Sequence, residues 1–434
     1  MHRRLFYALL ILLPSQFGKH FWPDFSFISG VRVDYLSPTL YLTDLLIIFI
    51  LSIYLKEQQT VVKKEMTRNR KLLAYSTGIM FLFLIISPQP ILTCFVLVRL
   101  LEGLYLIWYI NSARISIVTS ILCLIAGGIW TSTIGWWQLI SQSSIGGFLY
   151  FLGERTFSVV TPGIATVALA SRFILRPYAT FSHPNTFAGY ILILTPLLFS
   201  SELKKVKWFR FIHIPLLVGL VITILTTFSR SAWIVGVFLI AACIVFIILK
   251  KGHGVVVQLG IITALVTIGF MGIEPLRQRL VLTNQFDQTN LAIRTSLIKA
   301  SMAMTRDHPI GGVGLGNFLP TLPSYLTIHS IQELQPVHTI YLLYVSETGL
   351  LGLVALSILV VGYSKHIQQI KQNLKGKRGR SAAAPFMIAI GIWLLLGLFD
   401  HYPVSQQQTR LLMCIVIGLL FKQIQLLSGQ KVSA

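Results

Sequence analysis

The sequence predicts an all-α polytopic membrane protein with about twelve transmembrane helices and one large loop outside the membrane that contains short helices. Of the 434 residues, 54% are hydrophobic and 12% are charged, and the mean hydropathy is +0.74. These values are typical of chains that cross a bilayer many times rather than of soluble domains. We therefore expect a single membrane domain, residues 1–434, with one long polar insert at residues 273–336.

Apolar runs joined by short polar or proline-containing links recur along the chain. The first run follows a basic start, and no small-residue cleavage site follows it. We expect a span that extends toward Phe21 rather than a cleaved signal peptide. Residues 141–185 are less regular, and we expect a re-entrant or interfacial helix there, at the outer surface. The expected spans are residues 5–13, 40–55, 72–86, 91–110, 115–140, 186–200, 211–228, 234–249, 255–272, 337–361, 385–398 and 411–427.

The net charge of +22 is carried mainly by the short links between the apolar runs. In a soluble chain this charge would indicate nucleic acid, but here it follows the positive-inside rule and suits an anionic inner leaflet. With the basic links 56–71, 204–210 and 364–384 inside, both termini are cytoplasmic and the 273–336 loop faces outward. We therefore expect a multi-pass protein of the inner (plasma) membrane, bound to the lipid bilayer and not to nucleic acid, with its active site on the outer face.

The 273–336 loop has a helical pattern of its own, and long ordered loops are more often functional than idle. Side chains recur in it at helical spacing, at Leu291, Thr295, Ile298, Met302 and Met304 or Thr305. His308 and Pro309 should end that helix, and the glycine-rich run 311–316 should form a tight turn that approaches another segment closely. No Gly-Lys-Ser/Thr follows the glycines, so a nucleotide-binding loop is not expected.

His338 lies at the junction between this loop and the expected helix 337–361. Counting about 100° per residue places Gly349 and Gly352 on the histidine's face and Glu347 opposite. That face is small and smooth, which favours close helix packing. His338 is a candidate general base, and a histidine that only caps a helix start is the alternative.

Arginines gather on the side that the positive-inside rule should leave poor in positive charge. Arg230 lies at the outward turn between two apolar runs, and Arg279 and Arg294 lie in the 273–336 loop. For Arg230, the alternative is a side chain that snorkels at the membrane interface. Guanidinium groups match phosphate oxygens in shape and charge, so these arginines favour an anionic ligand such as a lipid-linked diphosphate.

Other polar residues at the expected outer surface are ambiguous. Arg176, His183 and Asn185 frame a segment that is either a proline-rich turn or part of a substrate site. Asp400 and His401 form a further outer pair, which is either loop or site.

Within a span, Arg99 and Glu102 are three residues apart and are expected to pair with each other or with a neighbouring helix. A transporter site is the alternative. The carboxylates and histidines do not occur at metal-ligand spacing, so we expect a reaction that uses no metal ion and no other cofactor.

Four stretches, in this order along the chain, resemble the O-antigen ligase/polymerase family of bacterial membrane glycosyltransferases. Residues 176–190 resemble the family's upstream His/Asn-Pro-Asn segment, and 229–233 its Ser-Arg turn. Residues 294–318 resemble the loop segment that ends in a glycine-rich turn. Residues 338–352 are similar to the histidine motif, with Thr339 where Asn, Ser or Gln is usual.

The resemblance implies a GT-C-like fold with residues 170–355 as the ligase-like core. It implies transfer of a glycan from undecaprenyl diphosphate to a hydroxyl of a glycan, lipid or protein acceptor, with inversion at the anomeric centre. Arg230 and Arg294 match the diphosphate-binding arginines, and His338 matches the histidine that acts as base or positions the acceptor. Secondary substrate contacts are expected at Arg176, His183, Asn185, Arg279 and His308.

Several functions remain open. An O-antigen ligase, a repeat-unit polysaccharide polymerase and a protein O-oligosaccharyltransferase share this chemistry and differ in the acceptor. A transporter or flippase of lipid-linked sugars belongs to a different class and would need a continuous polar path through the spans. A membrane scaffold would leave the outward arginines without a role.

Overall fold

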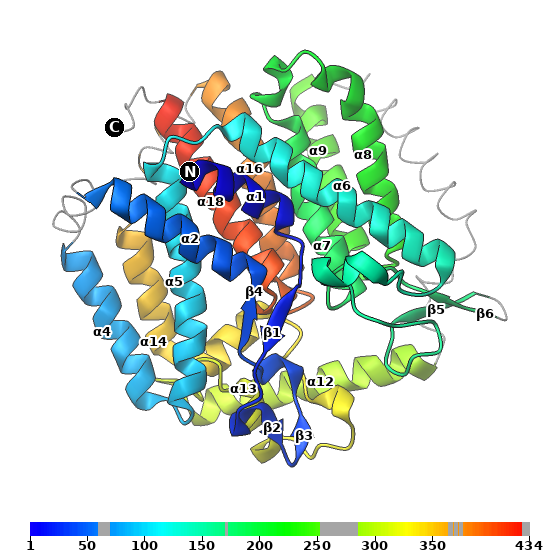
Figure 1. Cartoon of the computed structure of the whole chain (residues 1–434). Coiled ribbons are helices and arrows are strands. Elements are labelled where there is room, and N and C mark those ends of the chain that lie inside the picture. The colour runs from blue at the N-terminus through cyan, green and yellow to red at the C-terminus, as the bar shows by residue number, and fades with distance from the viewer. Residues whose placement is uncertain are drawn as a thin grey trace.

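The computed structural model describes residues 1–59, 70–169, 172–251, 285–362, 368, 372 and 376–427, which form a mostly helical protein (Figure 1). The α-helices are α1 (His2–Leu12), α2 (Leu42–Glu57), α4 (Arg70–Ile86), α5 (Pro90–Ser112), α6 (Ile117–Ser141), α7 (Pro184–Leu194), α8 (Phe209–Thr226), α9 (Arg230–Lys251), α12 (Gln285–Asp307), α13 (Phe318–Thr321), α14 (Ile340–Gly362), α16 (Lys377–Leu396), α17 (Tyr402–Ser405) and α18 (Gln407–Leu427). The strands are β1 (Gly18–His20), β2 (Phe27–Ile28), β3 (Val31–Arg32), β4 (Thr39–Tyr41), β5 (Thr166–Leu169) and β6 (Arg172–Leu175).

The helices confirm a helical membrane protein. Six in the described part are long and apolar enough to cross a bilayer, namely α5, α6, α8, α14, the 379–396 part of α16, and α18. Shorter apolar helices occupy 74–86, 184–199 and 230–241. The expected span 255–272 lies outside the described residues, and a total of about twelve spans stays a prediction.

Helix ends follow local chemistry. Pro90 occupies the first turn of α5, where its missing N–H costs no intrahelical bond. The Ser116 side chain accepts a hydrogen bond from Thr119 N at 3.2 Å and so caps the start of α6. Both boundaries lie where the apolar runs of the sequence begin.

Helix α7 is the centre of the core. Its contacts include α6, α8, α9, α16 and α18, and Phe187, Tyr190 and Ile191 are fully buried. Gly189 makes close packing possible, since a Cβ at that position would lie 2.2 Å from the Tyr402 hydroxyl. The short helix α7 is therefore fixed from all sides, and so is the segment that leads into it.

Three antiparallel two-stranded sheets depart from the all-α expectation. Helix α1 ends at Leu12 and does not extend toward Phe21, because the chain turns into β1, which pairs with β4. Strands β2 and β3 are joined by Ser29 and Gly30, both at positive φ, as a tight two-residue hairpin requires. Residues 141–185 form a short 3-10 helix (Gly147–Leu152) and the β5–β6 hairpin, rather than the expected re-entrant or interfacial helix.

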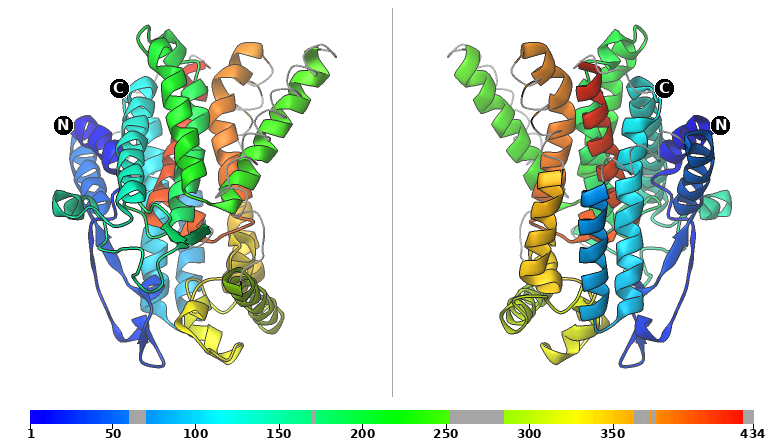
Figure 2. Two further views of the ribbon diagram at one scale, coloured as in Figure 1. Left: turned by 90° about the vertical axis from the view of Figure 1, so that its right-hand side faces the viewer. Right: turned by 90° about the vertical axis from the view of Figure 1, so that its left-hand side faces the viewer.

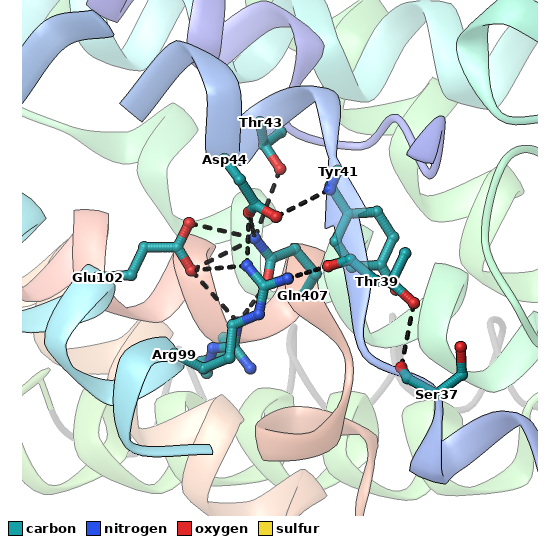
Figure 3. A network of polar contacts seen from close by, with 9 residues as sticks. Ser37, Thr39, Tyr41, Thr43, Asp44, Arg99, Glu102 and Gln407 are labelled. Carbon is teal, nitrogen blue, oxygen red and sulfur yellow. Dashed lines mark hydrogen bonds and ion pairs between the residues drawn. The ribbon is translucent and has the colours of Figure 1, made fainter. Parts of the chain in front are cut away.

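Residues 18–41, here called the N-terminal ribbon, run along the outside of the bundle to the end that carries α12 (Figure 2). A buried ion network joins this ribbon to the helices (Figure 3). Arg99 donates to the carbonyl of Thr39 and lies 2.6 Å from Asp44 and 3.4 Å from Glu102. Arg410 of α18 lies 3.5 Å from Glu102, and Gln407 donates to both carboxylates. Arg99 and Glu102 therefore pair with each other and with neighbouring elements.

Substitution of Arg99 by methionine should lower the melting temperature of the detergent-solubilised protein strongly. The change leaves two buried carboxylates without their main partner, and breaking such a cluster costs about 3–5 kcal/mol. The matched control is Arg210→Met, which removes an exposed arginine of α8. Equal melting temperatures for the two variants would contradict a structural role for the network.

Candidate active site

The sequence predicted that His338 lies within a helix at residues 337–361. In the structure it lies just before the helix instead. Helix α14 begins at Ile340, whose N–H donates to the carbonyl of Gly397 at 2.9 Å. This bond sets the start of α14 on the end of α16, so His338 lies beside the residues that follow α16. Its Nδ1 is 3.2 Å from Oδ1 of Asp400, and its side chain is 14% exposed.

Asp400 is the centre of the polar cluster. Besides His338, its carboxylate accepts a hydrogen bond from the backbone N–H of His401 at 2.8 Å and one from Nδ2 of Asn185 at 3.4 Å. Burial alone would raise the pKa of Asp400, but His338, His401 and the charge of Arg294 outweigh burial and hold that pKa well below its ordinary range. Asp400 is therefore an ionised, buried acceptor.

Burial acts in the opposite direction on the two neighbouring histidines, whose pKa values it lowers. Burial lowers the pKa of His401 to about 4, and its Nδ1 is 2.7 Å from the Ser405 hydroxyl. Burial, reinforced by the positive charge of Arg176, lowers the pKa of His183 to about 3. His183 Nδ1 accepts from the N–H of Asn185 at 3.1 Å, so this side chain caps the start of α7.

Arg176 and Asn185 extend the cluster toward α9. Arg176 is 4% exposed, and it donates from Nε to the carbonyl of Thr227 at 2.8 Å and from Nη2 to Oδ1 of Asn185 at 2.7 Å. Through Asn185 this arginine is joined to Asp400. Arg230 is the half-buried first residue of α9, three residues beyond Thr227. The bond to Thr227 therefore ties the turn before Arg230 to the cluster.

Helix α12 brings Arg294 to the same place. This half-buried arginine donates from Nη1 to the carbonyl of Phe399 at 3.4 Å, next to Asp400. His308, by contrast, is exposed just beyond the other end of α12, roughly 21 Å along the helix from Arg294. The structure therefore does not bring His308 into the cluster, and Arg279 lies outside the described residues.

The helix expected in the long loop is present as α12. However, three of the side chains that revealed its spacing, Leu291, Ile298 and Met302, lie on its exposed face. The buried stripe consists of Ile293, Leu297, Ala300 and Met304, which pack against the N-terminal ribbon and the segments around α13 and α14.

The glycine-rich turn after α12 inserts into a break in α14. Gly349 has φ +54° and ψ −148°, so the helix is not continuous as the sequence count assumed. The N–H of Leu350 donates to the carbonyl of Pro309 at 2.9 Å, and half-buried Glu347 accepts from the N–H of Gly316 at 2.9 Å and of Phe318 at 3.2 Å. These bonds fix the distance between the helix of Arg294 and the helix that follows His338.

One group of metal-ligand side chains occurs among the described residues. Single ligand atoms of His338, Asp400 and His401 lie within 4.8 Å of one another. Two imidazoles and a carboxylate are a donor set that suits Zn²⁺. Sequence spacing gave no sign of this group, because His338 and Asp400 are far apart in the chain.

Alanine in place of Gly349 should destabilise the protein and reduce its activity. The positive φ alone costs roughly 1–3 kcal/mol for a residue with a side chain, and the added Cβ would lie 2.6 Å from the carbonyl oxygen of Ile310. Gly391→Ala in α16 is the control, since its Cβ would meet no atom within 4 Å. Melting temperatures that fall equally for both variants would show that the break in α14 is not required.

Comparison with known families adds one match. Residues 215–357 match a family model described as O-antigen ligase, and no curated protein matches the chain. The matched segment runs from α8 into α14 and includes Arg230, Arg294 and His338. Over residues 215–357, the chain is therefore similar to the O-antigen ligase family.

Proposed function

We propose that the protein is a membrane glycosyltransferase of the O-antigen ligase type, which moves a glycan from undecaprenyl diphosphate to an acceptor hydroxyl. The observation that carries this proposal is the contact of His338 with the ionised Asp400, beside which Arg294 lies. A base held in one orientation next to fixed positive charge is the arrangement that such a transfer needs.

His338 is the proposed general base. With Nδ1–H donated to Asp400, Nε2 carries the lone pair and can accept a proton from the acceptor hydroxyl. The carboxylate also stabilises the imidazolium that forms. The acceptor oxygen then bonds to the anomeric carbon from the face opposite the diphosphate, which inverts that centre.

Arg230 and Arg294 are the proposed diphosphate ligands. As the bond between the anomeric carbon and the phosphate oxygen breaks, the electron pair stays on undecaprenyl diphosphate, and guanidinium groups stabilise the growing negative charge. Arg176 donates to Thr227 and Asn185 and so holds both in place, and we assign it a supporting role. His183 is likewise assigned to the cap of α7.

The remaining features of the proposal follow the charge pattern of the sequence. Both termini are cytoplasmic, the α12 end of the bundle faces outward, and the protein resides in the inner membrane. The core of a GT-C-like fold is residues 170–355.

Polymerase and protein O-oligosaccharyltransferase activities use the same chemistry as the proposed ligase. A transporter is disfavoured, because Arg99 and Glu102 belong to a paired network and not to a polar path through the spans.

His338→Ala should reduce transfer by roughly 10²- to 10⁴-fold, the usual contribution of a positioned general base. Asp400→Asn should also reduce it, because the amide no longer fixes the imidazole or stabilises its charge. The measurement is release of undecaprenyl diphosphate from the strain's own lipid-linked oligosaccharide by folded, purified protein. His329→Ala, an exposed histidine in the same loop region, is the control. Undiminished release of undecaprenyl diphosphate by His338→Ala and Asp400→Asn would contradict the assignment of His338 as the general base.

Chelation should leave transfer unchanged. We propose a metal-independent reaction in which the arginines supply the positive charge, although His338, Asp400 and His401 are chemically able to bind a cation. Transfer would be measured after dialysis against EDTA and again after addition of Zn²⁺. Loss of activity with EDTA and its recovery with Zn²⁺ would overturn this part of the proposal. Inhibition by added Zn²⁺ would agree with it, because the ion would bind His338 and block the proposed base.

A further inference from the structure

A large open cavity lies outside the polar cluster, at the α12 end of the bundle. It measures about 990 Å³ and lies between the N-terminal ribbon, the turn between α4 and α5, and the segment after α13. Both views in Figure 2 place the β2–β3 hairpin and α13 at this end. Nothing in the transfer chemistry proposed above uses this cavity.

Its lining combines aromatic rings with a few polar groups. Phe21 and Phe27 line it and are 49% and 42% exposed, so part of each ring is available to a ligand. Asp24 and Gln89, both exposed, supply a carboxylate and an amide at the same cavity. A pyranose ring presents an apolar face of C–H groups and a rim of hydroxyls, which suit an aromatic face and such polar groups, respectively.

The charge of the lining separates this cavity from the proposed diphosphate site. Within the described part of the chain, no arginine or lysine lines it, although the protein carries a net charge of +22. Asp24 would repel a phosphate or an anionic lipid headgroup, whereas it can accept hydrogen bonds from uncharged hydroxyls. The cavity therefore suits a neutral polyol better than the charged part of a lipid.

The walls of the cavity are held in place. The ring of Trp22 is stacked on His20 with centroids 5.7 Å apart, and the guanidinium of Arg32 lies 4.5 Å from the Trp22 centroid. At the other end of the ribbon, Arg99 holds the carbonyl of Thr39. A preorganised site binds a flexible chain molecule with a smaller ordering cost.

The same ribbon also reaches the polar cluster. The ring of Tyr35 packs edge-on against His401, with centroids 5.3 Å apart. Ile28, Val33 and Leu36 share a hydrophobic core with Leu297 of α12 and with Val337, the residue before His338. One face of the ribbon therefore supports the cluster, and another lines the cavity.

We propose that this cavity is a saccharide-binding subsite that holds sugar units remote from the bond being made. The proposal rests on the transfer function above, because only a glycan that extends beyond the reacting sugar would reach the ribbon. Binding remote units there would hold the reacting sugar near His338 for longer. The ligand chemistry is the same whether the sugars belong to the donor or to the acceptor.

The test separates binding from transfer. The probe is a diphosphate-free oligosaccharide released by mild acid from the strain's own surface polysaccharide, sized to one, two and four repeat units. Its affinity for the full-length protein in nanodiscs would be measured by calorimetry. Phe27→Ala and Asp24→Asn should each weaken binding of the longer oligosaccharides about tenfold. Phe211→Ala, which removes an exposed ring of α8, should leave it unchanged.

His338→Ala distinguishes failure of this inference from failure of the proposed function. That variant should bind the oligosaccharide normally while it transfers nothing. Binding unaffected by Phe27→Ala and Asp24→Asn in folded protein, or no binding to wild type, would overturn the subsite whatever the transfer assay shows. Displacement of the oligosaccharide by phospholipid would also overturn it.

Kinetics would identify the source of the sugars. If the donor glycan occupies the cavity, Phe27→Ala should raise KM for long lipid-linked donors and leave kcat and the acceptor KM unchanged. If the acceptor occupies it, the acceptor KM should rise instead. Either result supports the subsite, while a fall in kcat with both KM values unchanged contradicts it.

Discussion

The buried carboxylate of Asp400 is the constraint on which the arrangement of the cluster depends. An ionised group removed from water is tolerated only if hydrogen bonds and opposite charges replace its hydration. Here the replacements come from the start of α7, the segment before α14 and the residue that follows Asp400 itself. Arg294 on α12 adds its charge. Elements that are distant in sequence are thereby drawn to one point.

The buried polar clusters around Arg99 and around Asp400 differ in how their charges are partnered. The network around Arg99 matches two arginines with two carboxylates, so it is electrically complete and holds the ribbon to the bundle. Around Asp400, Arg176 reaches the carboxylate through Asn185, and Arg294 donates to the carbonyl of Phe399 beside it. Guanidinium groups held near a single buried carboxylate are compatible with the anionic diphosphate of the proposed function.

Much of the helical framework could be predicted from the sequence, because apolar runs are a strong signal that local chemistry does not obscure. Arg294 stood out as an arginine on the expected outer side, and His338 through its place at the junction between the long polar loop and the next helix. The partnership of His338 with Asp400 could not be predicted, since it depends on the start of α14 bonding to the end of α16. The break at Gly349 was missed because counting residues around a helix assumes that the helix is regular. Strands of two or three residues, as in the N-terminal ribbon, are too short to show any alternation.

The carboxylate that orients His338 belongs to a late part of the chain, and synthesis proceeds from the N-terminus. A nascent chain that has reached α14 already contains both proposed phosphate-binding arginines and the imidazole. It lacks the link between α16 and α17 that supplies Asp400. Insertion of the last helices is therefore the event that supplies this carboxylate, and a chain stalled before it lacks the partner that orients His338.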